Sequence, residues 1–170
     1  MKIPAIVKQY DFNLAYAKAL VHDVPELLMT HTPATGLENH PAFTLGHLLS
    51  GSALLAEDLG LEMNLPQAWV SLFVRNGPGD PRIPELDVEL YPTKLELLTA
   101  LESQHNRVKQ KLSELNEEQL QAPFKWRFSN YFPSVYDLIV FMCINHESMH
   151  LGQLAAWRRA MKLPSALALL

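Results

Sequence analysis

The segment N-H-E-S-M-H, residues 145–150, contains the residue types best suited to chemistry in this chain. Its H-E-x-x-H spacing sets His146 and His150 four positions apart, so on a helix both imidazoles lie on one face, about one turn apart. The two rings can then reach a single metal ion, and Glu147 supplies a carboxylate beside it that could accept a proton. We therefore predict a metal site with Glu147 as the catalytic residue. The alternative is two histidines on a partly polar helix face, and for Glu147 an ordinary ion pair with a neighbouring helix.

A third ligand is expected outside this pair, because catalytic zinc sites generally use three protein ligands. The residues after His150 include no His, Asp, Glu or Cys, whereas zinc peptidases with this motif take their third ligand downstream, so the sequence argues against a peptidase. We choose His47, which lies on the predicted inner face of an earlier helix, where Gly46, Ser50 and Gly51 leave space around it. His105, on the inner face of another helix, is the alternative ligand or a hydrogen-bonding core residue.

Other polar residues near the motif have simpler expected roles. Cys143 is expected to be a small buried hydrophobic side chain rather than a soft ligand. Gln153 could hydrogen-bond a ligand imidazole, and Gly152 is expected to allow close helix packing. The remaining histidines and the two arginines after the motif are expected to be solvated, with anion binding as the alternative for the arginines: His22, His31, His40, Arg158 and Arg159.

Four long windows without proline predict the helices that position these residues. Proline is excluded from helix interiors and favoured in first turns and loops. The 12 prolines of the chain leave open the windows 5–24, 42–65, 93–122 and 134–163.

Capping residues and apolar spacing support these helices. Thr93 with Glu96 and Ser134 with Asp137 form the pair that begins a helix, and Gly60 suits the end of the second window. Apolar residues recur at steps of three and four in each window. The predicted inner positions are Tyr10, Leu14, Ala17 and Val21; Phe43, His47, Ser50 and Leu54; Leu98, Leu101, His105, Val108, Leu112 and Leu115; and Val135, Ile139, Met142, His146, Met149, Gln153 and Trp157. We predict an all-α fold, a four-helix bundle, with residues 1–170 forming a single domain.

The connection between the second and third windows, residues 61–92, is long for a helical bundle and rich in proline and glycine. It could form a lid over the end of the bundle, anchored by Trp69 and Phe73, or include a short helix at 66–75. A simple crossover strap is the alternative.

Length and composition limit the class of protein. The chain has 170 residues, of which 48% are apolar and 19% charged, as in soluble globular proteins. A net charge of −4 without a densely basic window predicts no nucleic-acid partner. We also expect no membrane partner and a cytoplasmic location, because the chain has no apolar run of spanning length, no signal-peptide pattern at its start and a single cysteine.

Two segments resemble the signature regions of the DinB/YfiT-like metalloenzyme superfamily: N-H-P-A-F-T-L-G-H-L-L-S-G at 39–51 and I-N-H-E-S-M-H-L-G-Q-L-A-A-W-R-R at 144–159. The resemblance spans almost the whole chain. It implies a four-helix bundle in which His47, His146 and His150 hold a divalent ion. It also implies a homodimer, and it suggests the activities proposed for family members, metal-dependent thiol transfer and amide hydrolysis.

These patterns together predict a metal-dependent transferase or hydrolase that acts on a small molecule, for example a low-molecular-weight thiol. Three imidazoles suit zinc or nickel, with iron, copper or manganese as alternatives. The alternative from another class is a metal-binding or structural bundle without turnover, in which a fourth protein ligand such as His105 closes the site.

Overall fold

The computed structural model describes residues 3–77 and 80–170, and it confirms the all-α prediction within them. The described residues contain no strand, and β pairing is limited to an isolated bridge between Pro123 and Ser134. None of their helices is long and apolar enough to cross a membrane. The elements in chain order are α1 (Ile3–Val21), η1 (Glu26–Leu28), α2 (Pro41–Asp58), α3 (Gln67–Phe73), η2 (Val88–Leu90), α4 (Lys94–Glu114), α5 (Glu117–Gln121), α6 (Val135–Val140), η3 (Phe141–His146), α7 (Glu147–Ala160) and η4 (Ala166–Leu169).

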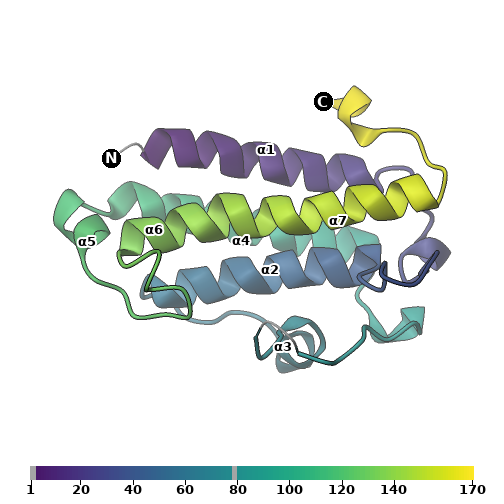
Figure 1. The fold of residues 1–170 in the computed structure, drawn as a ribbon, viewed down its shortest axis with the longest axis horizontal. Coiled ribbons are helices and arrows are strands. Elements are labelled where there is room, and N and C mark those ends of the chain that lie inside the picture. The colour runs from purple at the N-terminus through teal and green to yellow at the C-terminus, as the bar shows by residue number, and fades with distance from the viewer. Residues whose placement is uncertain (1–2, 78–79) are drawn as a thin grey trace.

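Four long helical segments lie side by side: α1, α2, α4 and the continuous run α6–η3–α7 (Figure 1). α2 packs on α4 and α7, and α1 packs on α4, η3 and α7. Two clusters of buried apolar side chains fill the interior. One surrounds Phe73, Leu97 and Trp157, and the other surrounds Val108 and Ile139. These clusters fix the positions of the helices that carry the candidate site.

Two helices begin, and one ends, at the capping residues that the sequence predicted. Thr93 with Glu96 begins α4, and Ser134 with Asp137 begins α6, each as a reciprocal capping box. Gly60 follows α2 with φ +86°, a left-handed conformation that glycine adopts without steric cost. Each of these three predictions is confirmed.

His40 is fully buried, so its expected exposure to solvent is wrong. Its Nδ1 accepts a hydrogen bond from the Phe43 N–H at 3.2 Å, which caps the start of α2. Its Nε2 donates to the Glu85 carbonyl at 2.9 Å. Burial is the main cause that lowers the pKa of His40 to about 4. The histidine is therefore a neutral helix cap that also ties α2 to the connection.

The inner faces of α2 and α4 differ from the prediction at single positions. Leu97 is fully buried, whereas the predicted Leu98 is partly buried against the same core, and Leu54 on α2 is 36% exposed. The third window also holds two helices, because Asn116 and Gln119 form a capping box that starts α5.

The last window contains a π-helical segment, η3, which the sequence did not predict. A π-helical turn holds more residues than an α-helical one, so it changes the rotation of the helix that follows. The core face of α7 is consequently Leu151, Leu154 and Trp157. The predicted inner positions Met149 and Gln153 are wrong, since both are exposed.

The long connection contains the short helix expected at 66–75, observed as α3. Phe73 is fully buried and Trp69 is partly buried against the same cluster, so both act as apolar anchors. Gly46 on α2 makes this possible, because a Cβ there would lie 2.2 Å from the Phe73 ring. Residues 78–79 of the connection lie outside the described residues.

Candidate metal centre

The three predicted histidines lie together, although they come from two helical segments far apart in sequence. His47 is on α2, His146 ends η3, and His150 is on the first turns of α7. One ring nitrogen of each lies within 4.8 Å of the corresponding nitrogens of the other two. The ring centroids are 5.3 Å apart for His47–His146, 4.6 Å for His47–His150 and 4.7 Å for His146–His150. Three imidazoles at this separation could converge on one metal ion.

Hydrogen bonds orient two of these rings. Nδ1 of His47 lies 2.9 Å from the Phe73 carbonyl oxygen, which can only accept, so Nδ1 carries the proton. Nδ1 of His150 lies 3.2 Å from Oε1 of Gln153, which assigns the same tautomer. Gln153 thus contacts one of the candidate ligand imidazoles. Asn39 donates to the same Oε1 at 3.1 Å and holds the amide in place. Nε2 of both histidines is therefore left free to bind a metal.

His146 depends on a glycine of the facing helix. A Cβ at Gly51 would lie 2.8 Å from Cε1 and 3.2 Å from Nδ1 of the His146 ring. The ring therefore occupies space that exists because residue 51 has no side chain. The sequence indicated small residues near His47, but it did not indicate that Gly51 makes room for His146.

All three ligand candidates are held neutral. Burial is the main cause that lowers the pKa of His146 to about 3 and that of His150 to about 4, and neighbouring histidines add to both shifts. Burial also lowers the pKa of His47. A neutral imidazole has the lone pair that a metal requires, so the cluster is ready to coordinate at neutral pH.

Glu147 lies in the core, away from solvent, although it adjoins His146 in sequence. The residue is 2% exposed, and its Oε1 lies 2.8 Å from Nε2 of His105 on α4. His105 in turn stacks on Tyr10 of α1, with ring centroids 3.6 Å apart. Burial raises the pKa of Glu147 and lowers that of His105 to about 3, so both shifts favour a neutral carboxyl that donates to a neutral imidazole.

The alternative ligands fall outside the group of three. His105 is the partner of Glu147, as the core hydrogen-bonding role anticipated. Cys143 is fully buried, and burial raises the pKa of its thiol, which agrees with the expected apolar role. Among the described residues, the cluster of potential metal ligands consists of His47, His146 and His150.

Two expectations for the residues after the motif are wrong. A Cβ at Gly152 would meet no atom within 4 Å, so this glycine permits no close packing. Arg158 is buried rather than solvated. It pairs with Asp23 and donates to the Leu20 and Pro164 carbonyl oxygens at 2.8 Å each, so it joins the ends of α1 and α7.

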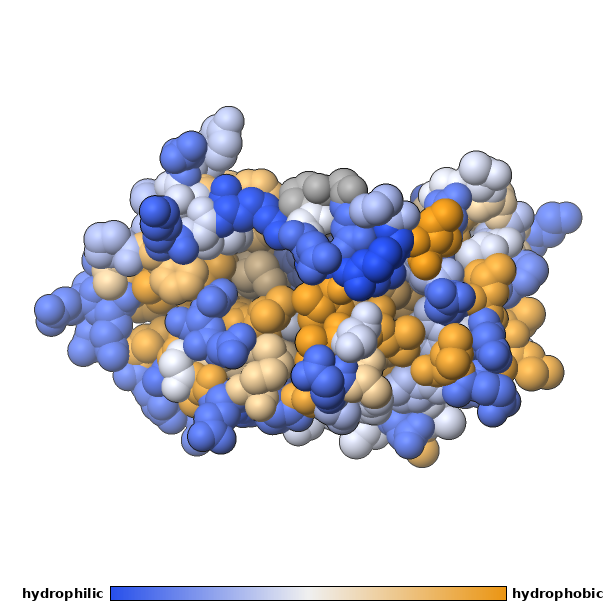
Figure 2. Space-filling model, turned by 90° about the horizontal axis from the view of Figure 1, so that it is seen from below, coloured by the Kyte–Doolittle hydropathy of each residue, from blue (hydrophilic) through white to orange (hydrophobic). Residues whose placement is uncertain are grey.

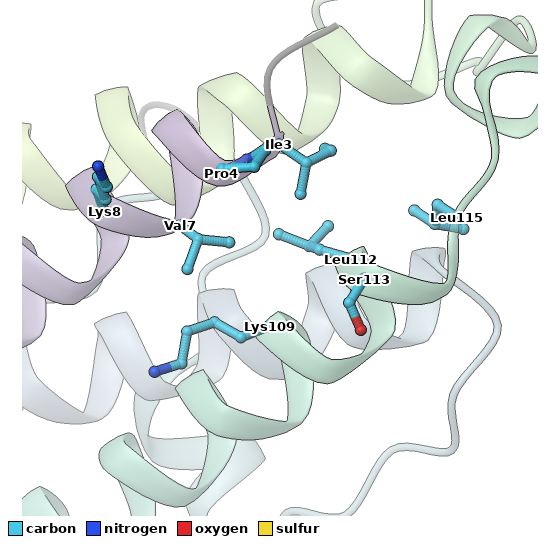
Figure 3. A pocket seen from close by; sticks show the side chains of 8 residues that line it. All are labelled: Ile3, Pro4, Val7, Lys8, Lys109, Leu112, Ser113 and Leu115. Carbon is cyan, nitrogen blue, oxygen red and sulfur yellow. The ribbon is translucent and has the colours of Figure 1, made fainter.

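A hollow of about 580 Å³ lies elsewhere, between the start of α1 and the end of α4 (Figure 3). Ile3 and Val7 line it from α1, and Leu112 lines it from α4. None of the three histidines contributes to this hollow, so it is separate from the candidate metal centre.

Comparison with known proteins adds one finding. A family model described as the DinB superfamily matches residues 9–154, a range that includes the three histidines, Glu147 and His105. No curated protein and no solved structure matches the chain.

Proposed function

The chain belongs to the DinB superfamily, and from its candidate site we propose that it is a metal-dependent enzyme that acts on a small molecule by thiol transfer or hydrolysis. The observation that carries this proposal is the convergence of three neutral imidazoles from α2, η3 and α7. We further propose that the four long helical segments constitute the predicted four-helix bundle and that residues 1–170 form one domain. The homodimer and the cytoplasmic location stay predictions.

In this proposal His47, His146 and His150 hold the ion. The Phe73 carbonyl and Gln153 fix the orientation of two of the rings. Three neutral ligands would leave a bound ion its positive charge, and the ion would supply Lewis acidity toward a thiol or carbonyl group. Zinc or nickel is the expected ion, and iron, copper or manganese would also accept imidazole ligands.

The role of Glu147 in proton transfer stays a prediction. Its place next to His146 in sequence favours that role. Its burial and its hydrogen bond to His105 favour a positioning role instead, because they fix the rotation of α7 from inside the core. A carboxyl anchored to α4 turns the neighbouring histidines toward α2.

The second candidate function is a structural or storage metal site without turnover. Such a site needs a fourth protein ligand to complete the coordination of the ion. No fourth His, Cys, Asp or Glu joins the three histidines among the described residues, which favours the open, reactive site.

Metal analysis tests the site directly. The purified protein should contain about one equivalent of a divalent ion, and each of His47→Ala, His146→Ala and His150→Ala should lose it while keeping its helical circular dichroism. His22→Ala is the matched control, because this histidine is exposed and outside the cluster. Full metal content in the His47 variant would exclude the site as proposed.

A further inference from the structure

A cationic side chain lies close to the candidate site, although the chain carries a net charge of −4. Arg75 lies beside Phe43, the aromatic residue that stacks on His47. A second arginine, Arg127, approaches the same connection at Gly77.

Arg75, two residues after α3, is fixed beside the site by packing. Its guanidinium lies 4.3 Å from the centre of the Phe43 ring, and Phe43 stacks on His47 with ring centroids 5.5 Å apart. One N–H of Arg75 donates to the Leu72 carbonyl at 3.3 Å. The contacts hold the side chain in place and leave most of its N–H groups available.

The charge of Arg75 has no ion-pair partner among the described residues. Asp80 acts on the pKa of Arg75, but its carboxylate is held by the Arg82 guanidinium, with Nε–oxygen distances of 2.9 and 3.1 Å. Partial burial, with Arg82 nearby, lowers the pKa of Arg75, and an anion placed beside it would relieve both effects.

Arg75 lines a hollow of about 340 Å³, to which Tyr91 and Arg82 also contribute. The three histidines do not line this hollow, and Arg75 links it to His47 through the Phe43 ring. The hydroxyl of Tyr91 is buried there without a well-formed hydrogen bond. Burial raises the pKa of Tyr91 to about 12, so the hydroxyl keeps its proton. Glu85 is the acidic residue of the lining, and its side chain is exposed. A free guanidinium and an unused hydroxyl donor are the groups that bind oxyanions.

Arg127 reaches toward the segment that carries Arg75. Its Nη2 would lie 3.3 Å from a Cβ at Gly77, two residues after Arg75. Its own position is exposed, so its N–H groups can reach a ligand from solvent. Figure 2 looks onto the face that carries α3, where strongly hydrophilic side chains lie beside apolar ones.

We propose that Arg75 and Arg127 bind an oxyanion, a carboxylate or a phosphate, of a small substrate whose reacting group lies at the three histidines. The inference rests on the proposed function, because it names the substrate class of that same site. Arg75 is the main determinant, since its packing against Phe43 and its hydrogen bond to the Leu72 carbonyl preorganise it, and Tyr91 lines the same hollow. An uncharged thiol or amide of the same size binds less tightly.

Ligand titration of the full chain loaded with cobalt(II) tests this inference without measuring turnover. The visible spectrum of cobalt reports the entry of a thiolate. The probes are mercaptoalkanoates of three to six carbons, and each is compared with the uncharged mercaptoalcohol of equal length. A series of lengths is needed because the separation of Arg75 from the ion determines which length binds best. The best acid should bind about tenfold or more tightly than its alcohol, as expected for a charge-assisted hydrogen-bonded pair.

Substitutions assign this preference to individual residues. Arg75→Gln should remove about tenfold of the affinity for the acid and leave that for the alcohol unchanged, Arg75→Lys should retain part of the preference, and Arg127→Gln should give a smaller loss. Arg159→Gln is the control, an exposed arginine near the end of α7. Unchanged cobalt affinity and circular dichroism would establish that the variants are intact. Inorganic phosphate that competes in an Arg75-dependent manner would support the oxyanion site and include phosphates as its ligands.

The outcomes separate the two proposals. If no thiol alters the cobalt spectrum, the open metal site is wrong, and the proposed function fails with it. If acid and alcohol bind equally, or if Arg159→Gln weakens the acid as much as Arg75→Gln does, the oxyanion site is wrong while the proposed function stands.

Discussion

His47 and His150 each use Nδ1 in a hydrogen bond and so direct Nε2 toward a possible ion. This arrangement depends on the rotation of α7, because a turn of that helix about its axis would move His146 and His150 together. Glu147, between them in sequence, points to the opposite side and contacts His105. We infer that the buried carboxyl–imidazole pair sets the direction of the metal ligands.

Substitution of Glu147 separates positioning from proton transfer. Glu147→Gln keeps the shape and a hydrogen bond to His105, so we expect a stability loss of about 1 kcal/mol or less and retained metal binding. Glu147→Ala leaves a cavity and an unpaired His105 nitrogen, and should cost about 3 kcal/mol. Urea denaturation and metal titration measure both effects. A glutamine variant that binds metal normally but has lost its activity would instead identify Glu147 as the catalytic base.

Alanine substitutions at two helix glycines, one beside His146 and one in open space, test whether His146 needs the space next to it. Gly51→Ala should weaken metal binding tenfold or more, because its Cβ would lie 2.8 Å from the His146 ring and displace it. Gly152→Ala places a methyl group in open space, so it should raise stability by about 0.5–1 kcal/mol and leave metal affinity unchanged. Isothermal titration with zinc and thermal melts provide the comparison. Equal metal affinities in the two variants would contradict the assigned role of Gly51.

At the scale of elements, the start of α2 is pH-sensitive because its cap is a buried histidine. The pKa of His40 falls from 6.5 to about 4 on folding, so the unfolded chain binds the proton more readily. The stability that His40 contributes is complete above pH 6.5 and is lost as the pH falls toward 4. The full loss amounts to about 3 kcal/mol.

His40→Asn tests this cap, since asparagine is a good helix cap that does not titrate here. In the metal-free protein the variant should be about 1 kcal/mol less stable at pH 7, because the bond to Glu85 is lost. It should also lose less stability than the native chain between pH 6.5 and 4. Parallel stability curves across this range, measured by urea denaturation, would refute the role of His40.

The helices were predictable from sequence, but their rotations were only partly so. Proline-free windows and the Thr93 and Ser134 caps are local signals, and the structure confirms them. The π-helical segment η3 was not predicted by any such local signal. Its Cys143 carbonyl accepts a hydrogen bond from Asn13 of α1 at 3.1 Å, a long-range contact that local patterns do not indicate. The predicted inner face of the last window therefore fails at Met149, beyond η3.

The candidate site was likewise predictable where it depends on local spacing and unpredictable where it depends on long-range contacts. The spacing of His146 and His150 survives the change in rotation, because both residues lie beyond most of η3 and share one face. The Phe73 carbonyl and Arg75 could not be predicted, since their contributions depend on how α3 docks against α2.

At the scale of the whole molecule, two apolar clusters hold the helices together through contacts that need no metal ion. Phe73, Leu97 and Trp157 represent one cluster, and Val108 and Ile139 represent the other. The buried Arg158 adds a further tie between α1 and α7 that needs no metal. The fold therefore has sources of stability that do not depend on an ion.

Removal of the metal should accordingly leave the protein folded. We expect chelation to preserve the helical circular dichroism. It should lower the free energy of unfolding only as mass action requires, by about 2.7 kcal/mol relative to a metal concentration of 100 times Kd. The His146→Ala/His150→Ala double variant should melt at a temperature independent of added metal, because it has lost two of the three ligands. A structural metal contributes folding energy outright, so its removal unfolds the chain. Cooperative unfolding on chelation in the native protein, but not in the double variant, would therefore favour the structural site over the enzyme, because the ion would then hold α2 and α7 together.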